Sequence, residues 1–183
     1  MGADYERELK GILAGDADSV RQVTVSATPE EGRDYRRILE HPFLVVRGAG
    51  SLGVDLVALR HDFSFPLEVK SSAKPTIAFS RNERMKEQAD RMQADCGRAG
   101  VIPMYAFRLK AHRGDPWRLF AMEPANAFRG RMRILQEKVP RLGVSAAGNY
   151  ILHFEKGLKL SGFIAFLEFL RAPMEPTAVA EPH

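Results

Sequence analysis

Cysteine is almost absent from the sequence, since Cys96 is the one thiol in 183 residues. A lone cysteine excludes an internal disulfide bond and a zinc site built from cysteines, so a reducing, intracellular compartment is expected. No apolar run approaches the roughly 18 residues that a membrane-spanning helix needs, and we expect no membrane span. The N-terminal MGADYERELK is charged and lacks the apolar core of a signal peptide. Together these absences predict a cytoplasmic protein.

The residues that are present form an ordinary globular composition, with 45% hydrophobic and 27% charged residues. The length suits a single domain with one proper core. The net charge of +4 and a pI near 9.4 are compatible with a polyanionic partner, although modest basicity is common. Lysine and arginine gather in two segments, 81–91 and 129–141. Each segment is either a nucleic-acid contact or a solvated helix face, and composition leaves both open.

The hydrophobic spacing predicts both helices and strands. An amphipathic helix is predicted over 5–13, and a capping signal at Thr28 predicts a second helix that ends before Pro42. Between them, Val23 and Val25 indicate a short extended piece. Strands are predicted over 43–47, 54–59, 63–70, 101–109, 117–122 and 150–154, and further helices over 81–99, 125–136 and 160–170. The strands are apolar enough to be covered on both faces, which predicts one α/β domain followed by a disordered tail over 172–183.

The chemically informative stretch is GSLGVDLVALRHDFSFPLEVK, residues 50–70. Asp55 stands near the start of one predicted strand. Glu68 and Lys70 stand two apart on the next strand, so their side chains share a face. A tight turn at 61–62 pairs the two strands and brings Asp55 close to Glu68. Two carboxylates and an ammonium group are therefore expected at one edge of an otherwise apolar sheet.

Neighbouring carboxylates repel each other unless one takes up a proton or a cation binds between them. Mg²⁺ suits a site with oxygen ligands, few protein contacts and several retained waters. Such a cation can bind a phosphate oxygen and lower the pKa of a bound water, while Lys70 holds the attacking water or neutralises the developing charge. The predicted chemistry is phosphodiester hydrolysis with Mg²⁺, for which Mn²⁺ can substitute. The alternative is a strand with solvent-facing polar residues and an exposed lysine.

Several motifs occur in a fixed order along the chain. They are EREL at 6–9, VVRGAGSLGVDLVA at 45–58, EVK at 68–70, and a strand over 100–110 that is closed by a Trp-Arg pair at 117–118. This order resembles archaeal-type Holliday junction resolvases, which belong to the PD-(D/E)xK nuclease superfamily. The resemblance covers 4–13 and 43–122, and it is weak or absent for 16–42 and beyond residue 125.

The resemblance implies a restriction-endonuclease-like mixed β-sheet flanked by helices, with one nuclease domain over 1–171. Asp55 and Glu68 are implied to be the principal metal ligands, and Glu6 is implied to reach the metal directly or through water. Lys70 is implied to be the catalytic lysine, and Ser51 is implied to approach the scissile phosphate. Residues 16–42 form an insertion relative to the family, which leaves the docking of DNA and the dimer edge open.

The resemblance also implies a set of DNA contacts. Arg7 and Arg47 would bind DNA phosphates, Ser51 would bind DNA from its glycine-flanked loop, and Gln88 would lie near the metal on a helix. Each of these positions has a plainer alternative. Arg7 can belong to a solvated helix face, Arg47 to a surface ion pair, Ser51 to a simple turn and Gln88 to an exposed helix surface.

The implied activity is the resolution of four-way DNA junctions by paired cuts. One active site cannot cut two opposing strands at once, so a twofold homodimer is expected. Candidate contacts for the second copy are residues 101–109, 117–120 and the apolar helix 163–169, although complete burial explains that helix equally well. Two rival functions remain: a nuclease that acts on linear duplex in repair or restriction, and a non-catalytic DNA-binding module that keeps the fold.

Overall fold

The computed structural model describes residues 2–48, 53–81, 83–122 and 128–171. The first half of the chain forms α1 (Gly2–Leu13), α2 (Ala17–Val23), α3 (Pro29–Arg36), η1 (Arg37–Leu39), β1 (Leu44–Arg47), β2 (Leu56–Leu59), β3 (Ser64–Ser72) and β4 (Thr76–Ala78). The second half forms η2 (Phe79–Arg81), α4 (Glu83–Ala99), β5 (Met104–Leu109), β6 (Trp117–Ala121), α5 (Gly130–Lys138), β7 (Gly143–Val144), β8 (Tyr150–His153), η3 (Phe154–Lys156), β9 (Leu158–Lys159) and α6 (Leu160–Arg171). The expected tail over 172–183 lies outside the described residues.

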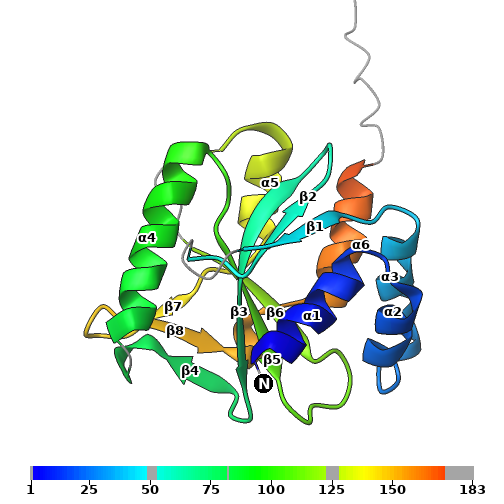
Figure 1. The fold of residues 1–183 in the computed structure, drawn as a ribbon, viewed down its shortest axis with the longest axis horizontal. Helices are drawn as coiled ribbons and strands as arrows, with labels where there is room; N and C mark the ends of the chain where they lie inside the picture. The colour runs from blue at the N-terminus through cyan, green and yellow to red at the C-terminus, as the bar shows by residue number, and fades with distance from the viewer. Residues whose placement is uncertain (1, 49–52, 82, 123–127, 172–183) are drawn as a thin grey trace, which may run out of the picture.

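The described strands form two sheets. The larger sheet has the order β1-β2-β3-β5-β6-β9, and the smaller has the order β4-β8-β7. In the larger sheet β3 and β5 are parallel, whereas the other neighbouring strands are antiparallel. Helices cover this sheet on both sides (Figure 1). The predicted fold class, a mixed β-sheet flanked by helices in a single α/β domain, is therefore confirmed.

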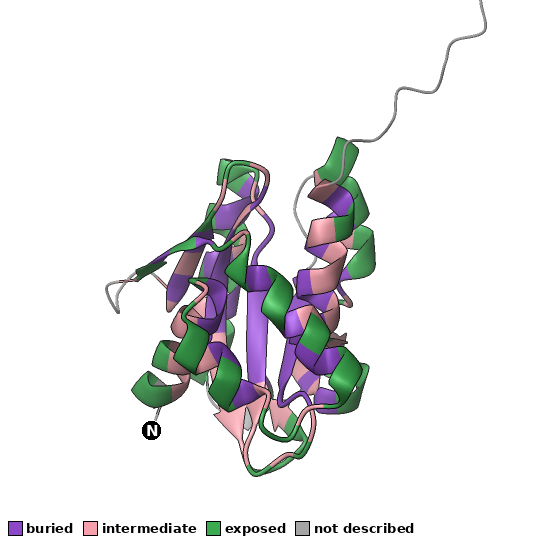
Figure 2. Ribbon diagram, turned by 90° about the vertical axis from the view of Figure 1, so that its right-hand side faces the viewer, coloured by how far each residue is buried: buried purple, intermediate pink, exposed green. Residues whose placement is uncertain are grey.

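Each face of the large sheet has its own apolar core. Successive residues of β5 point to opposite faces: Met104 and Ala106 belong to the cluster with α1 and α6, and Tyr105 and Phe107 belong to the cluster with α4 and the small sheet. Figure 2 shows the central strands buried, with exposed residues on the outer faces of the helices. This double burial explains why the strand sequences are apolar throughout rather than alternating.

The segment between α1 and β1 corrects one prediction. Val23 and Val25 suggested an extended piece, but residues 17–23 form the helix α2. Asp16 caps it, because its Oδ1 accepts a hydrogen bond from the backbone N–H of Ser19 at 2.8 Å. Val20 and Val23, three residues apart, are buried in the core shared with α1.

The predicted capping box of α3 is present, since Thr28 and Glu31 exchange both hydrogen bonds.

Residues 16–42 dock closely onto the rest of the domain. The hydroxyl of Tyr35 donates to Oδ1 of Asp115 at 2.8 Å. The same carboxylate accepts from the backbone N–H of Trp117 at 2.9 Å and from that of Ser161 at 2.8 Å. Lys159 reaches Glu31 at 2.8 Å. A buried carboxylate thus joins this segment to β6 and α6.

No helix in the described part of the chain has the length and apolar composition that crossing a bilayer requires.

Candidate active site

Asp55 and Glu68 come together through the antiparallel pairing of β2 and β3. The register aligns Leu56 with Leu67, which places Asp55 beside Glu68 one position further along. Two hydrogen bonds fix Asp55 there: its backbone N–H donates to the Leu67 carbonyl at 3.0 Å, and its Oδ2 accepts from the Val69 N–H at 2.7 Å. The side chain of Asp55 is therefore tied to the backbone of the strand that carries Glu68.

A close approach of the backbone supports this position of Asp55. The Gly48 N–H donates to the Asp55 carbonyl at 2.8 Å. A Cβ atom at residue 48 would lie 2.1 Å from the Val54 carbonyl oxygen, and no side chain can be accommodated at that separation. Glycine at this position lets the end of β1 pass directly over the residue that precedes Asp55. The intervening residues 49–52 include the predicted Ser51, which lies outside the described residues.

Lys70 lies on the same face of β3 as Glu68 and binds it. The Lys70 Nζ donates to Glu68 Oε1 at 2.6 Å, and it also lies 3.3 Å from Oε1 of Gln88 on α4. The ammonium group thus connects the sheet carboxylate to the helix that covers this face. Gln88 therefore lies beside the predicted catalytic lysine.

Burial makes negative charge unfavourable at both carboxylates. Glu68 is only 2% exposed, and the loss of solvation raises its pKa to about 7 although Lys70 opposes the shift. Burial also raises the pKa of Asp55, and the nearby charge of Glu6 adds to that effect. A bound cation would favour the ionised form of both groups.

Two buried polar atoms at this site lack a hydrogen-bond partner within the described residues: Glu68 Oε2 and the hydroxyl of Tyr105. A buried carboxylate oxygen normally has a hydrogen-bond partner. Carboxylate oxygens are also the ligands that Mg²⁺ prefers. Among the described residues, no group of three or more acidic, histidine or cysteine side chains is close enough to hold a metal ion. Asp55 and Glu68 alone still fit Mg²⁺, which is commonly held by one or two carboxylates and several waters.

Glu6 is engaged elsewhere than at the carboxylate pair. Its Oε2 forms an ion pair with the guanidinium of Arg47, at the end of β1. Its charge still influences Asp55, so α1 lies near the site. Arg7 points away into solvent and pairs with Asp4 at 3.4 Å.

Glu8 has a structural role that sequence reasoning missed. Its Oε1 accepts from Arg108 Nε at 3.0 Å and from Trp117 Nε1 at 2.9 Å. Glu8 thereby attaches α1 to β5 and β6, next to the turn of helix that carries Glu6. Trp117 is completely buried, so it is a core residue. These contacts join residues about one hundred positions apart, and no local pattern reveals them.

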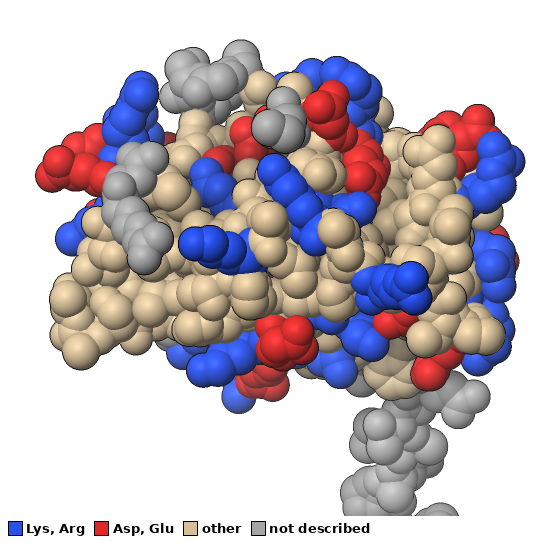
Figure 3. Space-filling view, turned by 90° about the horizontal axis from the view of Figure 1, so that it is seen from below, with Lys and Arg blue, Asp and Glu red and all other residues tan. Residues whose placement is uncertain are grey.

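A polar groove of about 330 Å³ begins at Lys70. Its lining combines ammonium and hydroxyl groups with a few apolar side chains: Lys70, Ser71, Ser72, Lys74, Thr76, Ile77, Ala78 and Met85. It follows the end of β3 into β4, at the lower edge of the sheet in Figure 1. Figure 3 shows Lys and Arg side chains spread across the middle of the face seen from that edge. Lys70, which binds Glu68, therefore connects that carboxylate to the groove.

Comparison with known proteins gives a distant likeness to a solved structure. No protein-family model matches the chain, and no curated protein matches it. Among solved structures, the chain is similar to Hjc of Archaeoglobus fulgidus, a Holliday junction resolvase from an archaeal hyperthermophile. The identity is 18%, the TM-score is 0.44, and the match covers 67% of this chain and 81% of that chain. The likeness is distant on both measures and identifies neither a family nor an activity for this chain.

Proposed function

We propose that this protein is a Mg²⁺-dependent endonuclease that hydrolyses phosphodiester bonds in DNA. One observation carries the proposal: two adjacent carboxylates, one with a buried oxygen that has no hydrogen-bond partner within the described residues, lie beside a lysine that lines a groove with a second lysine and three hydroxyl groups. A purely structural ion pair between Glu68 and Lys70 leaves the second oxygen of Glu68 unexplained. It also leaves unexplained why Asp55 is fixed beside Glu68, where its charge is unfavourable.

Asp55 and Glu68 would hold the cation, with Glu6 contributing directly or through water. When bound, the cation polarises a phosphate oxygen and lowers the pKa of a water molecule. Mn²⁺ would replace Mg²⁺, whereas Ca²⁺, with its larger and looser coordination, would support DNA binding without cleavage. Arg47 holds Oε2 of Glu6, so Glu6 would contribute through its other oxygen or after releasing Arg47.

Lys70 would supply positive charge at the reacting phosphate. Its ammonium has three donors, of which Glu68 and Gln88 engage two. The remaining donor can stabilise the negative charge that develops on the phosphate oxygens, or it can hold the attacking water. Gln88 and Glu68 keep the ammonium in place, so little reorganisation is needed when the substrate arrives.

The polar groove would bind the DNA strand next to the cleaved bond. Lys74 and the hydroxyls of Ser71, Ser72 and Thr76 suit phosphate oxygens, and the groove is continuous with Lys70. Arg7, exposed on α1, would add a further phosphate contact. Arg47 would also bind a DNA phosphate, once that phosphate replaces Glu6 as its partner. The Glu6 carboxylate would then be available to the cation.

The predicted contacts of the second copy need correction. β5 lies between β3 and β6 inside the sheet, and the side chains from Trp117 to Phe120 are buried in the same chain. These two segments are therefore interior, not available to a partner. On α6, Phe163, Ile164 and Leu167 are buried as well, while Phe169 is 73% exposed. Complete burial, the alternative left open by the sequence, explains most of that helix.

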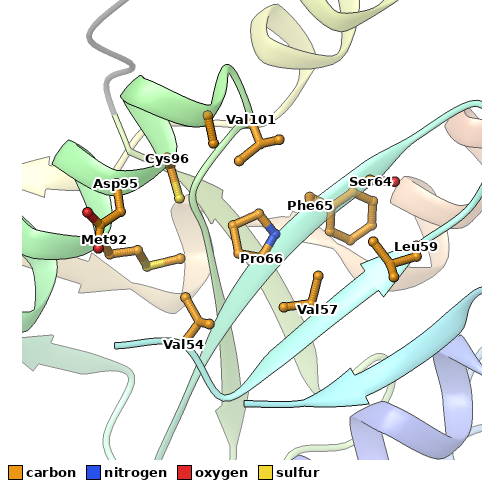
Figure 4. Close-up of a pocket in the computed structure, with 11 residues that line it drawn as sticks. Val54, Val57, Leu59, Ser64, Phe65, Pro66, Met92, Asp95, Cys96 and Val101 are labelled. Atoms are coloured by element: carbon orange, nitrogen blue, oxygen red, sulfur yellow. The ribbon is translucent and has the colours of Figure 1, made fainter. Parts of the chain in front are cut away.

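We propose instead that a second copy binds the β1–β2 apolar face, which consists of Leu44, Val46, Val57 and Leu59. The strand register puts these side chains on one side of the sheet, where Leu44 is 69% and Val46 48% exposed. The face continues into an apolar pocket of about 280 Å³ under the C-terminal half of α4 (Figure 4). A contiguous exposed apolar surface is typical of an interaction site, and a twofold contact of this face with itself closes without further copies.

Four-way junctions are the substrate that we propose, because a twofold dimer presents two active sites to a twofold-symmetric DNA. The test is a gel assay in which a synthetic junction and its component duplexes are incubated with Mg²⁺, with Ca²⁺ or with chelator. We expect paired cuts in the junction with Mg²⁺ only. Asp55→Asn should lower cleavage by several orders of magnitude and keep junction binding, whereas Glu87→Gln, an exposed carboxylate on α4, should retain full activity.

Equal cleavage of junction and duplex would replace the resolvase with a nuclease of broader substrate range. Binding without any metal-dependent cleavage would leave a DNA-binding module and contradict the catalytic assignment.

A further inference from the structure

Tyr105 lies directly beside Glu68 in the centre of the large sheet. The parallel register of β3 and β5 pairs these two residues, and side chains at paired positions of neighbouring strands point to the same face. Tyr105 is completely buried, and its ring packs against Phe79, with 5.5 Å between ring centroids. The phenol is therefore held rigidly next to the carboxylate pair, on the side away from β2.

The hydroxyl of Tyr105 has no partner within the described residues. Tyr35, which is equally buried, contrasts with it by donating to Asp115 at 2.8 Å. Phe107 occupies the next position on the same face of β5 and packs in the same core, so an aromatic ring without a hydroxyl is well accepted there. Packing accounts for the ring of Tyr105 but not for its oxygen atom.

Two unpartnered polar groups of complementary type thus lie on the same face of two neighbouring strands, at paired positions. Tyr105 is a neutral phenol that can donate, and Glu68 Oε2 is an acceptor. The other oxygen of Glu68 is already bound to Lys70 at 2.6 Å. A water molecule that accepts from the phenol and donates to Oε2 would satisfy both groups, as buried waters do in polar sites.

We propose that Tyr105 is a positioning residue for Glu68, acting through one bound water. With Lys70 on one oxygen and the Tyr105 water on the other, the carboxylate plane cannot rotate, and Glu68 presents a fixed edge to the cation. This inference rests on the proposed function, since it assigns Tyr105 a part in organising the metal ligand. Groups that orient a metal ligand in this way commonly change metal affinity by about 10-fold or more when they are removed.

The substitution Tyr105→Phe removes the oxygen and keeps the ring. Two measurements on the DNA-free protein test it: Mn²⁺ affinity, from the electron paramagnetic resonance signal of free Mn²⁺, and the melting temperature with and without Mn²⁺. We expect about 10-fold weaker Mn²⁺ binding and a smaller Mn²⁺-induced rise in melting temperature. The control is Tyr150→Phe, whose ring contacts the same Phe79 and whose hydroxyl reaches Gln93 instead; its Mn²⁺ affinity should equal that of the wild type.

The outcomes distinguish a failure of the Tyr105 proposal from a failure of the endonuclease proposal. If the wild type binds Mn²⁺ and Tyr105→Phe binds it equally well, Tyr105 has no positioning role, while the endonuclease proposal stands. A Tyr105→Phe protein that melts higher than the wild type and keeps its full Mn²⁺ affinity would identify the hydroxyl as a merely unsatisfied buried group. If the wild type binds no Mn²⁺, the metal site itself is absent and both proposals fail.

Discussion

At the scale of single residues, the candidate site could be located from the sequence because its central part is local. Asp55, Glu68 and Lys70 belong to one antiparallel pair of strands, and the two-residue period of a strand is enough to put Glu68 and Lys70 on one face. Tyr105 and Glu8 could not be assigned in the same way. Tyr105 is next to Glu68 through a parallel strand pair, and Glu8 on α1 binds Trp117 on β6, 109 positions further along the chain, so neither contact leaves a local pattern.

Lys74 provides a test of the groove at this scale. If the groove carries a DNA phosphate, Lys74→Ala should weaken junction binding and reduce the slope of log affinity against log salt by about one counterion. Fluorescence anisotropy at a series of salt concentrations measures this slope, with Ca²⁺ present to prevent cleavage. The control is Arg133→Ala on α5, which also removes one positive charge but lies outside the groove, where the guanidinium pairs with Glu137. This control should leave the slope unchanged. An unchanged slope for Lys74→Ala would move the DNA path away from the groove.

At the scale of elements, the predictions succeeded where a segment signals its own boundaries. The α3 capping box is such a signal, and so are the continuous apolar runs of the main strands. The predictions failed where contacts with distant parts of the chain decide whether a segment forms a helix or a strand. α2 is stabilised by the burial of Val20 and Val23 against α1, and β4, β7 and β9 are only two or three residues long, so they exist only through their pairing partners.

The attachment of α1 should be sensitive to Glu8. Glu8→Ala leaves the indole N–H of Trp117 and the guanidinium of Arg108 without their acceptor, which should lower the free energy of unfolding by about 2 kcal/mol. Glu8→Gln keeps an acceptor oxygen and should lose about half as much. Urea denaturation measures both, with the exposed Glu87→Ala as control. Stability equal to the wild type in Glu8→Ala would show that α1 is held by its apolar face alone.

The β1–β2 apolar face can be tested with one charge. Val46→Lys places an ammonium in the middle of the proposed contact, so the variant should remain folded but monomeric, near 20.5 kDa, whereas the wild type should show twice that mass by light scattering. Val144→Lys introduces the same charge at an exposed valine of the small sheet, and its mass should match the wild type. A dimer that persists in Val46→Lys would place the interface elsewhere.

At the scale of the whole molecule, the proposed activity requires two sites in one assembly. Dimers containing one wild-type chain and one Asp55→Asn chain, separated by different affinity tags, should convert a cruciform plasmid mainly to nicked circles. The wild-type dimer should give linear product with little nicked intermediate. Agarose gels of the time course distinguish these products. Efficient linearisation by the mixed dimer would mean that one site cuts both strands in turn, and that a dimer is not needed for resolution.

The parallel pairing of β3 with β5 also has a consequence for the order of folding. The hairpin of β2 and β3 closes a short loop, so Asp55 and Glu68 can meet early. Tyr105 and Gln88 can join them only after the chain has passed through β4 and α4, and closing that longer loop costs more chain entropy. Substitutions within the hairpin should therefore change the folding rate, while substitutions at Tyr105 or Gln88 should change mainly the unfolding rate. The carboxylates would be assembled while still exposed to water, and their burial would come as the last step.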